Sequence, residues 1–425
     1  MKHKICLHGI NVKNKGQLLD AVKKILPLAA EKTRQKEKYL PDNDMLKYSS
    51  YKFSVPGSKD YKVICLSGIM VVSDRLLPVN DVVIEYDNRG LPAVQRILKK
   101  LLGGKLHFVL EEPDLLLRLQ QQRGRFKIEE LPLYDEDSVA TVLNCHLPVQ
   151  VYNVSKLWGV FLQQPGEKPS VRQLRVKLRR LRSSLALFKP LLPEAKLLYW
   201  KAEFKKWTDM LGGAREYDVA LMTCMKIRRS RQEDAEQPLE LEQLLQERRQ
   251  RQAKKVLHLS SINAMTAALL DFLLMLYSLP LNKEMRQLRL RSFLRQRLST
   301  WCDKLLLLPE RYPDVEDMEQ LHKIRIKIKR FRYALQAAPE ITVTPVLLRR
   351  LKNLQDMLGL LHDNYINDQL IEDIVAANKD NAELRCEGAM FRGWDSARSE
   401  AVLTSLPEIW EDFSCCLQEW QEEYL

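Results

Sequence analysis

The chain has 425 residues, of which 45% are hydrophobic and 29% charged, so a folded core can form and wholesale disorder is excluded. The 68 Lys and Arg against 55 Asp and Glu give a formal net charge of +13, which favours a polyanionic partner such as nucleic acid, anionic lipid or polyphosphate. The 8 cysteines are scattered without a CxxC pair or zinc-like spacing, a pattern typical of reduced thiols in a cytoplasmic protein.

Residues 1–147 are predicted to form a mixed α/β domain. Segments rich in Val and Ile predict strands, and amphipathic segments predict helices. The predicted strands are Lys4–Ile10, Tyr61–Ser73, Asp81–Tyr86 and Leu106–Leu110, and the predicted helices are Lys15–Leu28 and Leu91–Leu102. Leu147-Pro148-Val149 marks the predicted boundary.

Residues 148–425 are predicted to form an all-α domain, with repeat halves at about 150–255 and 256–425. Its most apolar stretch, Ile262–Leu281, is interrupted by Asn263, Asp271 and Pro280. We therefore expect a buried helix there and no membrane span.

An internal repeat carries the strongest signal in this second part. Residues 171–182 align without a gap with residues 321–332, at an offset of 150. Both copies have apolar residues at the 3-4 spacing of an amphipathic helix and basic residues along the margin of that stripe. A second pair, residues 207–216 and 354–363, matches at an offset of 147. Duplication of a four-helix unit explains both matches, and it would bring the two basic helices together across a pseudo-twofold axis.

The basic stripes predict an anion-binding surface. A solvated helix face normally intersperses acidic residues, yet no Asp or Glu occurs between Arg172 and Arg182 or between His322 and Arg332. Like charges at i,i+4 cost a few tenths of a kcal/mol per pair. Their retention in both copies suggests that a bound anion offsets the cost.

These repeats resemble the CHAD family, the conserved histidine α-helical domain. The pattern is a His, then Arg-Val/Ile, then a basic run, once per half, each followed by a Leu-Gly-x-x-Arg/Asn-Asp element, and it covers about residues 150–425. The resemblance implies a pair of pseudo-twofold-related four-helix bundles with a basic groove that binds inorganic polyphosphate. It also implies a location at cytoplasmic polyphosphate granules, with granule-associated proteins as further partners. The expected polyphosphate-binding residues are Arg172, Arg175, Lys177, Arg179, Arg180, Arg182, His322, Arg325, Lys327, Lys329, Arg330 and Arg332.

Two departures qualify the resemblance. Arg172 stands where the family has its first His, so the charge is kept but a role for paired histidines becomes doubtful. CHAD domains often follow a CYTH domain, and residues 1–147 are loosely compatible with a degenerate relative of it. The Glu-x-Glu-x-Lys signature of that fold is missing, however, because the equivalent stretch is His3–His8.

The sequence also bears on catalysis, metal binding and nucleic-acid binding. Without paired carboxylates we expect no catalytic residues, metal or cofactor, although a phosphohydrolase acting through residues 1–147 stays an alternative. His322, Asp356, His362 and Asp363 lack a metal-ligand spacing, and the expected roles of Asp356 and Asp363 are structural: pairing with Arg or helix capping. A nucleic-acid-binding module is a further alternative, with only nonspecific binding expected because no known recognition motif occurs.

Overall fold

The computed structural model describes residues 3–26, 30–39, 44–54, 59–122, 137–163, 168–230, 239–259, 262–280, 282–311, 317–337 and 345–424. The chain divides into two compact units, and each takes up several separate stretches of the sequence. The first comprises Met1–Leu131, Leu143–Lys177 and Leu257–Leu281, and the second comprises Pro132–Val142, Leu178–Val256 and Asn282–Leu425.

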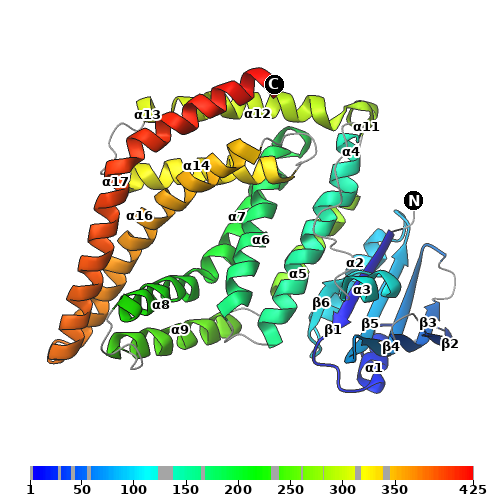
Figure 1. Ribbon diagram of the computed structural model, residues 1–425. Coiled ribbons are helices and arrows are strands. Elements are labelled where there is room, and N and C mark those ends of the chain that lie inside the picture. Colours follow the sequence, from blue (N-terminus) through cyan, green and yellow to red (C-terminus); the bar gives the residue numbers. More distant parts are fainter. Residues whose placement is uncertain are drawn as a thin grey trace. The chain divides into compact units, whose positions relative to one another are not determined.

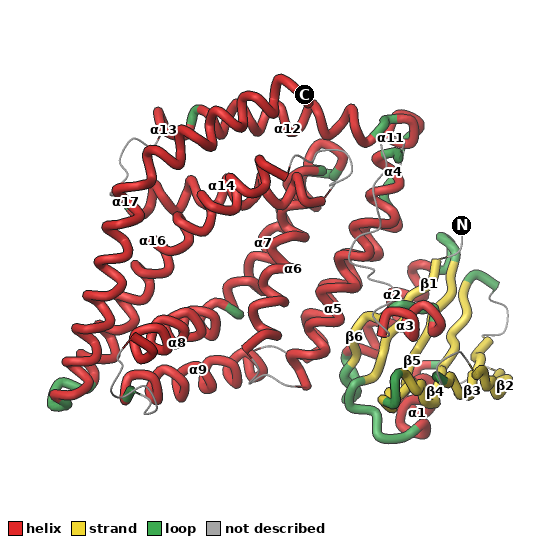
Figure 2. The backbone as a smooth tube through the Cα atoms, in the orientation of Figure 1, coloured by secondary structure: helices red, strands yellow, loops and turns green. Residues whose placement is uncertain are grey.

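The first unit is built on an antiparallel sheet with the strand order β2-β3-β4-β5-β1-β6 (Figure 2). The strands are β1 (His3–Gly9), β2 (Ala30–Tyr39), β3 (Met45–Ser54), β4 (Tyr61–Val72), β5 (Arg75–Tyr86) and β6 (Phe108–Glu111). A tight turn joins β4 to β5 through Ser73 and Asp74, whose φ angles of 48° and 64° suit the right-handed twist of a hairpin. The Asp44 carboxylate accepts the Ser73 N–H at 2.9 Å and so supports this turn.

Helices from both parts of the sequence complete the first unit (Figure 1). They are α1 (Lys15–Ile25), α2 (Leu91–Leu102), α3 (Leu115–Gln122), α5 (Leu147–Gln163), α10 (Ile262–Tyr277) and the N-terminal part of α6 (Lys168–Leu187). Side chains of α5 and α10 bond to the backbone of edge strand β6. Ser155 accepts the Leu110 N–H at 2.7 Å, and Thr266 donates to the Phe108 carbonyl at 2.7 Å. The predicted apolar helix is thus α10, and it is buried as expected.

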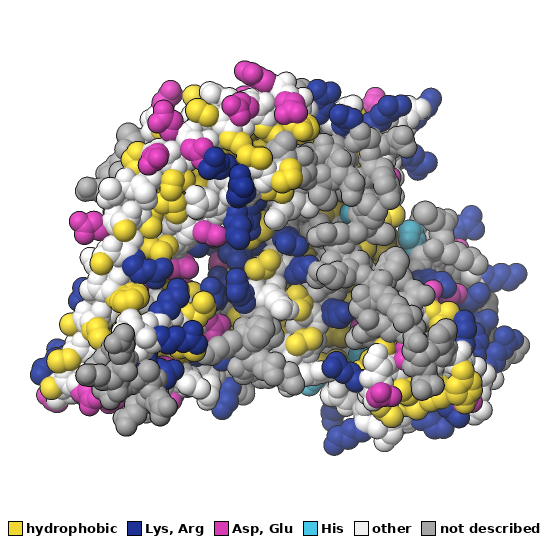
Figure 3. Space-filling view, in the orientation of Figure 1, with side chains coloured by type: hydrophobic (Ala, Val, Ile, Leu, Met, Phe, Trp, Pro, Cys, Tyr) yellow, Lys and Arg dark blue, Asp and Glu magenta, His cyan; other side chains and the backbone are white. Residues whose placement is uncertain are grey.

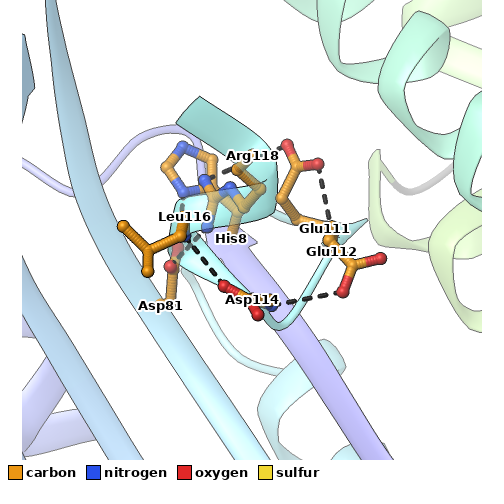
Figure 4. Close-up of polar contacts among 7 residues, drawn as sticks. All are labelled: His8, Asp81, Glu111, Glu112, Asp114, Leu116 and Arg118. Atoms are coloured by element: carbon orange, nitrogen blue, oxygen red, sulfur yellow. Dashed lines mark hydrogen bonds and ion pairs between the residues drawn. The ribbon is translucent and has the colours of Figure 1, made fainter. Parts of the chain in front are cut away.

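A buried ion cluster joins α3 to the sheet (Figure 4). The Asp114 carboxylate accepts the Leu116 N–H at 2.9 Å in the first turn of α3, which carries Arg118 over the face of β1 and β5. Asp81 is fully buried and lies between Arg118 and His8: its carboxylate is 2.6 Å from Arg118 Nη1 and 2.7 Å from His8 Nδ1. These partners hold the pKa of Asp81 below its usual value although burial alone would raise it.

The second unit is helical. Its members are α4 (Val139–Thr141), the rest of α6, η2 (Lys189–Leu191), α7 (Glu194–Met210), α8 (Gly212–Ser230), α9 (Glu240–Leu259), α11 (Lys283–Gln287), α12 (Leu290–Leu306), α13 (Leu308–Arg311), α14 (Met318–Ala337), α16 (Pro345–Ala377) and α17 (Ala382–Tyr424). The long helices α16 and α17 lie side by side, and α8, α9, α16 and α17 share one hydrophobic core (Figure 1). Glu387 of α17 accepts the Glu240 and Leu241 N–H groups, which fixes the start of α9.

The predicted fold class is confirmed: an α+β region with an antiparallel sheet is followed by a helical domain. The sheet is compatible with the CYTH-like expectation for the first 147 residues. Strands β2 and β3 were not predicted, because they lack the Val and Ile runs that mark the other strands. Within the described ranges, no helix has the length and hydropathy needed to cross a bilayer.

Substitution of the buried carboxylate should destabilise the first unit. Asp81→Asn leaves Arg118 buried without its counter-charge, so the free energy of unfolding should fall by about 3–5 kcal/mol. Urea denaturation followed by circular dichroism measures the change. The matched control is Lys4→Ala, which breaks the exposed Lys4–Glu85 pair on the same two strands and should cost less than about 1 kcal/mol. A loss as small as the control's would show that the cluster does not hold α3 to the sheet.

Candidate anion-binding site

The two predicted basic helices are α6 and α14, and both bury the apolar stripe seen in the sequence. Leu174, Leu178 and Leu181 of α6 are completely buried, and Leu321, Ile324, Ile328 and Phe331 of α14 are at most 6% exposed. This burial fixes the rotation of each helix about its axis. Most of the predicted basic residues therefore lie at the margin of the buried seam and are half-buried, whereas Arg172 and Arg330 are exposed.

One group of these residues surrounds Arg325, and we call it the α14–α16 cluster. It comprises Arg179, Arg215, His322, Arg325, Lys329, Arg332, His362 and Asp363, all in the second unit. The carboxylate of Asp363 lies 3.4 Å from Arg325 Nη2, which confirms the structural pairing expected for this residue. Burial lowers the pKa of Arg325, and Arg179 and Arg215 lower it further.

The Arg325 side chain packs against α16 at Gly359. A Cβ added at Gly359 would lie only 3.8 Å from Arg325 Nε and Nη2, so the guanidinium packs against the helix surface at this glycine. Gly359 belongs to the Leu-Gly element of the second repeat. In the first repeat the equivalent element breaks the chain between α7 and α8 at Leu211, whereas α16 continues through it.

Crowding of positive charge changes the protonation of the cluster. Burial and the neighbouring Arg325 and Arg179 lower the pKa of Lys329 to about 6, against a usual value near 10.5. Burial, with Arg325 and His322, lowers the pKa of His362 to about 3. The pKa of His322 is also lowered, chiefly by burial. Its Nδ1 lies 3.3 Å from Nδ1 of His362, a contact that neutral rings can make as a hydrogen bond.

Several guanidinium groups of this cluster retain unused donors. The Nε atoms of Arg179, Arg325 and Arg332 are buried, and none has a hydrogen-bond acceptor within the described part of the chain. Buried polar groups are normally hydrogen-bonded, and donors left over in a cationic site point to an anionic ligand.

A second group of cations gathers at the C-terminal end of α6, and we call it the α6-end cluster. It comprises Arg182, Lys189, Lys201, Arg297 and Arg330. Arg297 of α12 donates to the Ala186 and Leu187 carbonyls at 3.2 and 3.1 Å, and so is fixed against the last turn of α6. Burial lowers the pKa of Lys201, and the four other cations lower it further. Burial lowers the pKa of Arg182, Asp209 opposes this, and Arg330 and Arg179 lower it further, so Arg182 connects the two clusters.

Figure 3 shows Lys and Arg side chains in a column beside a hollow in this face of the second unit. Among the predicted site residues, the structure brings together Arg179, Arg182, His322, Arg325, Lys329, Arg330 and Arg332. Arg180 and Lys327 are half-buried on the same helices but are not among the residues that define the two clusters. Arg172, Arg175 and Lys177 belong to the part of α6 that lies in the first unit.

The sequence-based prediction did not include Lys189, Lys201, Arg215, Arg297 or His362. The signal for Arg215 and His362 was present, since they occupy equivalent places in the second pair of repeated segments. Lys201 lies among other lysines of α7 and gave no signal of its own. Within the residues that the structure describes, no group of three or more His, Cys, Asp and Glu side chains is arranged to hold a metal ion.

Comparison with known proteins finds one family match and two similar folds. Residues 162–372 match the sequence model of the CHAD domain. The fold is similar to the crystal structure of the CHAD domain from the plant Ricinus communis, with 24% identity and a TM-score of 0.55 over 67% of this chain and 96% of that one. It is also similar to PptA from Streptomyces chartreusis, with 17% identity and a TM-score of 0.52 over 65% of this chain and 99% of that one. No curated protein matches the chain in sequence.

Removal of the Lys329 amine should stabilise the free protein. Lys329→Met at pH ~7.5 should raise the free energy of unfolding by about 0.5–2 kcal/mol, because the native state no longer has to hold this amine among arginines. The gain should shrink as the pH rises toward 10, since unfolding of the wild type takes up a proton on Lys329 between its folded and unfolded pKa values.

Thermal denaturation in a buffer free of phosphate measures this effect. Lys323→Met is the matched control on the same helix, because Lys323 is exposed and pairs with Glu319 at 2.8 Å. A lower melting temperature of Lys329→Met would contradict the claim that repulsion from the neighbouring arginines makes the Lys329 amine destabilising in the native state.

Proposed function

We propose that this chain, which carries a domain of the CHAD family, binds inorganic polyphosphate at the α14–α16 cluster and the α6-end cluster without chemically altering it. The observation that supports the proposal best is the convergence of cations from α6, α7, α8, α12 and α14, offset by Asp363 beside Arg325 and Asp209 beside Arg182. A bound polyanion would offset the repulsion that lowers the pKa values of these groups.

The side chains suit the chemistry of linked phosphates. An arginine fork can donate two parallel hydrogen bonds to phosphate oxygens, and such charge-assisted bonds are about twice as strong as neutral ones. The unused Nε donors of Arg179, Arg325 and Arg332 supply this geometry. Polyphosphate carries about one negative charge per phosphate along a flexible chain, so it can follow cations that lie on several helices.

Features of the first unit support binding rather than hydrolysis. A sheet that hydrolyses triphosphate with metal ions needs carboxylates free to hold them. Asp81 points to the face of the sheet that carries Cys6 and His8, but its two oxygens are engaged by His8 and Arg118. Leu115 and Leu119 of α3 cover the same face and form a hydrophobic cluster with Cys6.

Binding of polyphosphate without catalysis suits a role at polyphosphate granules. A protein that holds polyphosphate in this way would locate to polyphosphate granules, and we propose that it targets or organises them, together with granule-associated proteins. Nucleic acid would compete only through its phosphate charge, because the aromatic residues of the basic stripes, Phe331 and Tyr333, are buried and cannot stack on bases.

Charge reversal in the α14–α16 cluster tests the proposal. Arg179→Glu with Arg332→Glu should weaken polyphosphate binding at least about 100-fold, since two charge-assisted contacts become repulsive. Fluorescence anisotropy with a labelled long chain measures the affinity, and circular dichroism checks that helicity persists. Lys99→Glu with Lys100→Glu makes the same change of net charge at two exposed residues of α2, in the first unit and outside both clusters. Equal losses in the two double variants would overturn the assignment of the site.

Binding should also be coupled to protonation. Near pH ~7.5 the amine of Lys329 is mostly neutral in the free protein, and anionic oxygens beside it would raise its pKa from about 6, so complex formation takes up a proton. The affinity should therefore decrease as the pH rises above about 6. Calorimetric titrations in two buffers of different ionisation enthalpy measure the uptake. Lys329→Met should reduce the uptake to the part contributed by His322 and His362, whose pKa values are also lowered in the free protein. A binding enthalpy that does not depend on the buffer in the wild type would contradict the coupling.

A further inference from the structure

Strand β2 forms one edge of the sheet in the first unit. It stands at the end of the strand order, and among the described residues only β3 pairs with it. The strand is 10 residues long, and the side chains of residues 33–39 are all exposed. Its outer edge therefore offers a row of backbone N–H and C=O groups with which another extended segment can pair.

The two faces of β2 differ in charge. Side chains alternate along a strand, so Arg34, Lys36 and Lys38 lie on the same face. The residues opposite them on β3 carry no charge, and none of the three cations has an ion-pair partner in the described part of the chain. Glu37 lies on the other face, where its carboxylate pairs with Lys47 at 3.3 Å. One face of this edge therefore presents a row of cations without a counter-charge.

This alternation of charge opposes pairing of the edge with a second copy of itself. A symmetric antiparallel pair of strands is related by a twofold axis perpendicular to the sheet, so the numbers of two residues that face each other differ by an even amount. Each register centred on this stretch therefore places cations opposite cations, for example Arg34 opposite Lys38 and Lys36 opposite its own copy. Like charges directly opposite each other destabilise a strand pair, so the edge selects a partner of different sequence.

The other face of the same edge adds an apolar contact. The register of the sheet aligns one apolar residue from each of β2, β3, β4 and β5 in a single row: Tyr39, Met45, Val71 and Leu76. The ends of the row are open to solvent, since Tyr39 is 73% and Leu76 66% exposed. A segment that pairs with β2 would extend this row by one side chain beside Tyr39, and an apolar residue fits that place.

We propose that the outer edge of β2 binds an extended acidic segment of a partner protein, which pairs antiparallel to the strand and carries carboxylates at every second position. The carboxylates lie beside Arg34, Lys36 and Lys38 on one face, and an apolar residue lies beside Tyr39 on the other. Main-chain hydrogen bonds to the edge supply affinity, and the alternation of charge supplies selectivity. The surface lies wholly within the first unit and is independent of the proposed binding of polyphosphate.

Fluorescence anisotropy of labelled peptides titrated with the full chain tests the proposal. The probe Ile-Glu-Thr-Glu-Thr-Glu-Thr matches residues 33–39 in antiparallel pairing. The control peptide Ile-Glu-Glu-Glu-Thr-Thr-Thr has the same composition, but in an extended strand its carboxylates divide between the two faces. The alternating peptide should bind at least about tenfold more tightly than the control peptide. Equal affinities would overturn the proposal.

A charge swap locates the binding surface. Lys36→Glu with Lys38→Glu should weaken binding of the alternating acidic peptide at least about tenfold, and it should create binding of the peptide Ile-Lys-Thr-Lys-Thr-Lys-Thr, a gain that a misfolded variant cannot give. Lys99→Glu with Lys100→Glu makes the same change of net charge on α2 and should leave the preference of the wild type unchanged. Retained binding of the acidic peptide by the β2 variant would overturn the proposal.

Three further outcomes would also overturn the proposal. If the cations of β2 serve only to prevent aggregation at the edge, the wild type binds neither peptide. If the wild type sediments as a dimer that Lys36→Glu with Lys38→Glu dissociates, a second copy occupies the edge. If Arg179→Glu with Arg332→Glu abolishes the preference for the alternating peptide, the peptide binds at the proposed polyphosphate site instead. Failure of polyphosphate binding itself would leave the test at β2 unchanged.

Discussion

Cations that repel one another lie half-buried between the helices of the second unit, and this repulsion favours the binding of an anion among them. Burial and neighbouring cations lower the pKa values of Lys329, Arg325, Arg182 and Lys201 together. Asp363 offsets part of the charge near Arg325. Such an arrangement stabilises a bound anion more than it stabilises the free fold, which is the usual relation between a binding site and the stability of the protein that carries it.

In the first unit, by contrast, buried charges are paired inside the protein. There Asp81 lies between His8 and Arg118, and both oxygens of its carboxylate are used inside the protein. The charges stabilise the packing of α3 on the sheet instead of being left for a ligand. Two helices from later in the sequence, α5 and α10, bond to the outer edge of β6, so folding of the sheet depends on residues far from it in the chain.

Much of the fold could be predicted from the sequence because burial follows periodicity. The helix over Leu91–Leu102 and the apolar stripes of α6 and α14 are examples. Strand β2 could not be predicted in this way, because it is an edge strand rich in charged residues, and residues 33–39 are all exposed and form no apolar face. For the site, a duplicated stripe was visible as a pattern. The contribution of Lys201 and Arg297 depends on tertiary packing, which places single cations from α7 and α12 beside the end of α6.

The most direct test of polyphosphate binding is a competition titration at ~0.15 M salt, where the Debye length is about 8 Å and charges far from the ligand contribute little. Labelled long-chain polyphosphate bound to the full chain would be challenged with heparin, single-stranded DNA and double-stranded DNA at equal concentrations of charge. Convergent arginines in a built site predict that polyphosphate binds at least about 100-fold more tightly than either DNA. Equal displacement by all of the polyanions would contradict this prediction and would reduce the two clusters to a nonspecific charged surface.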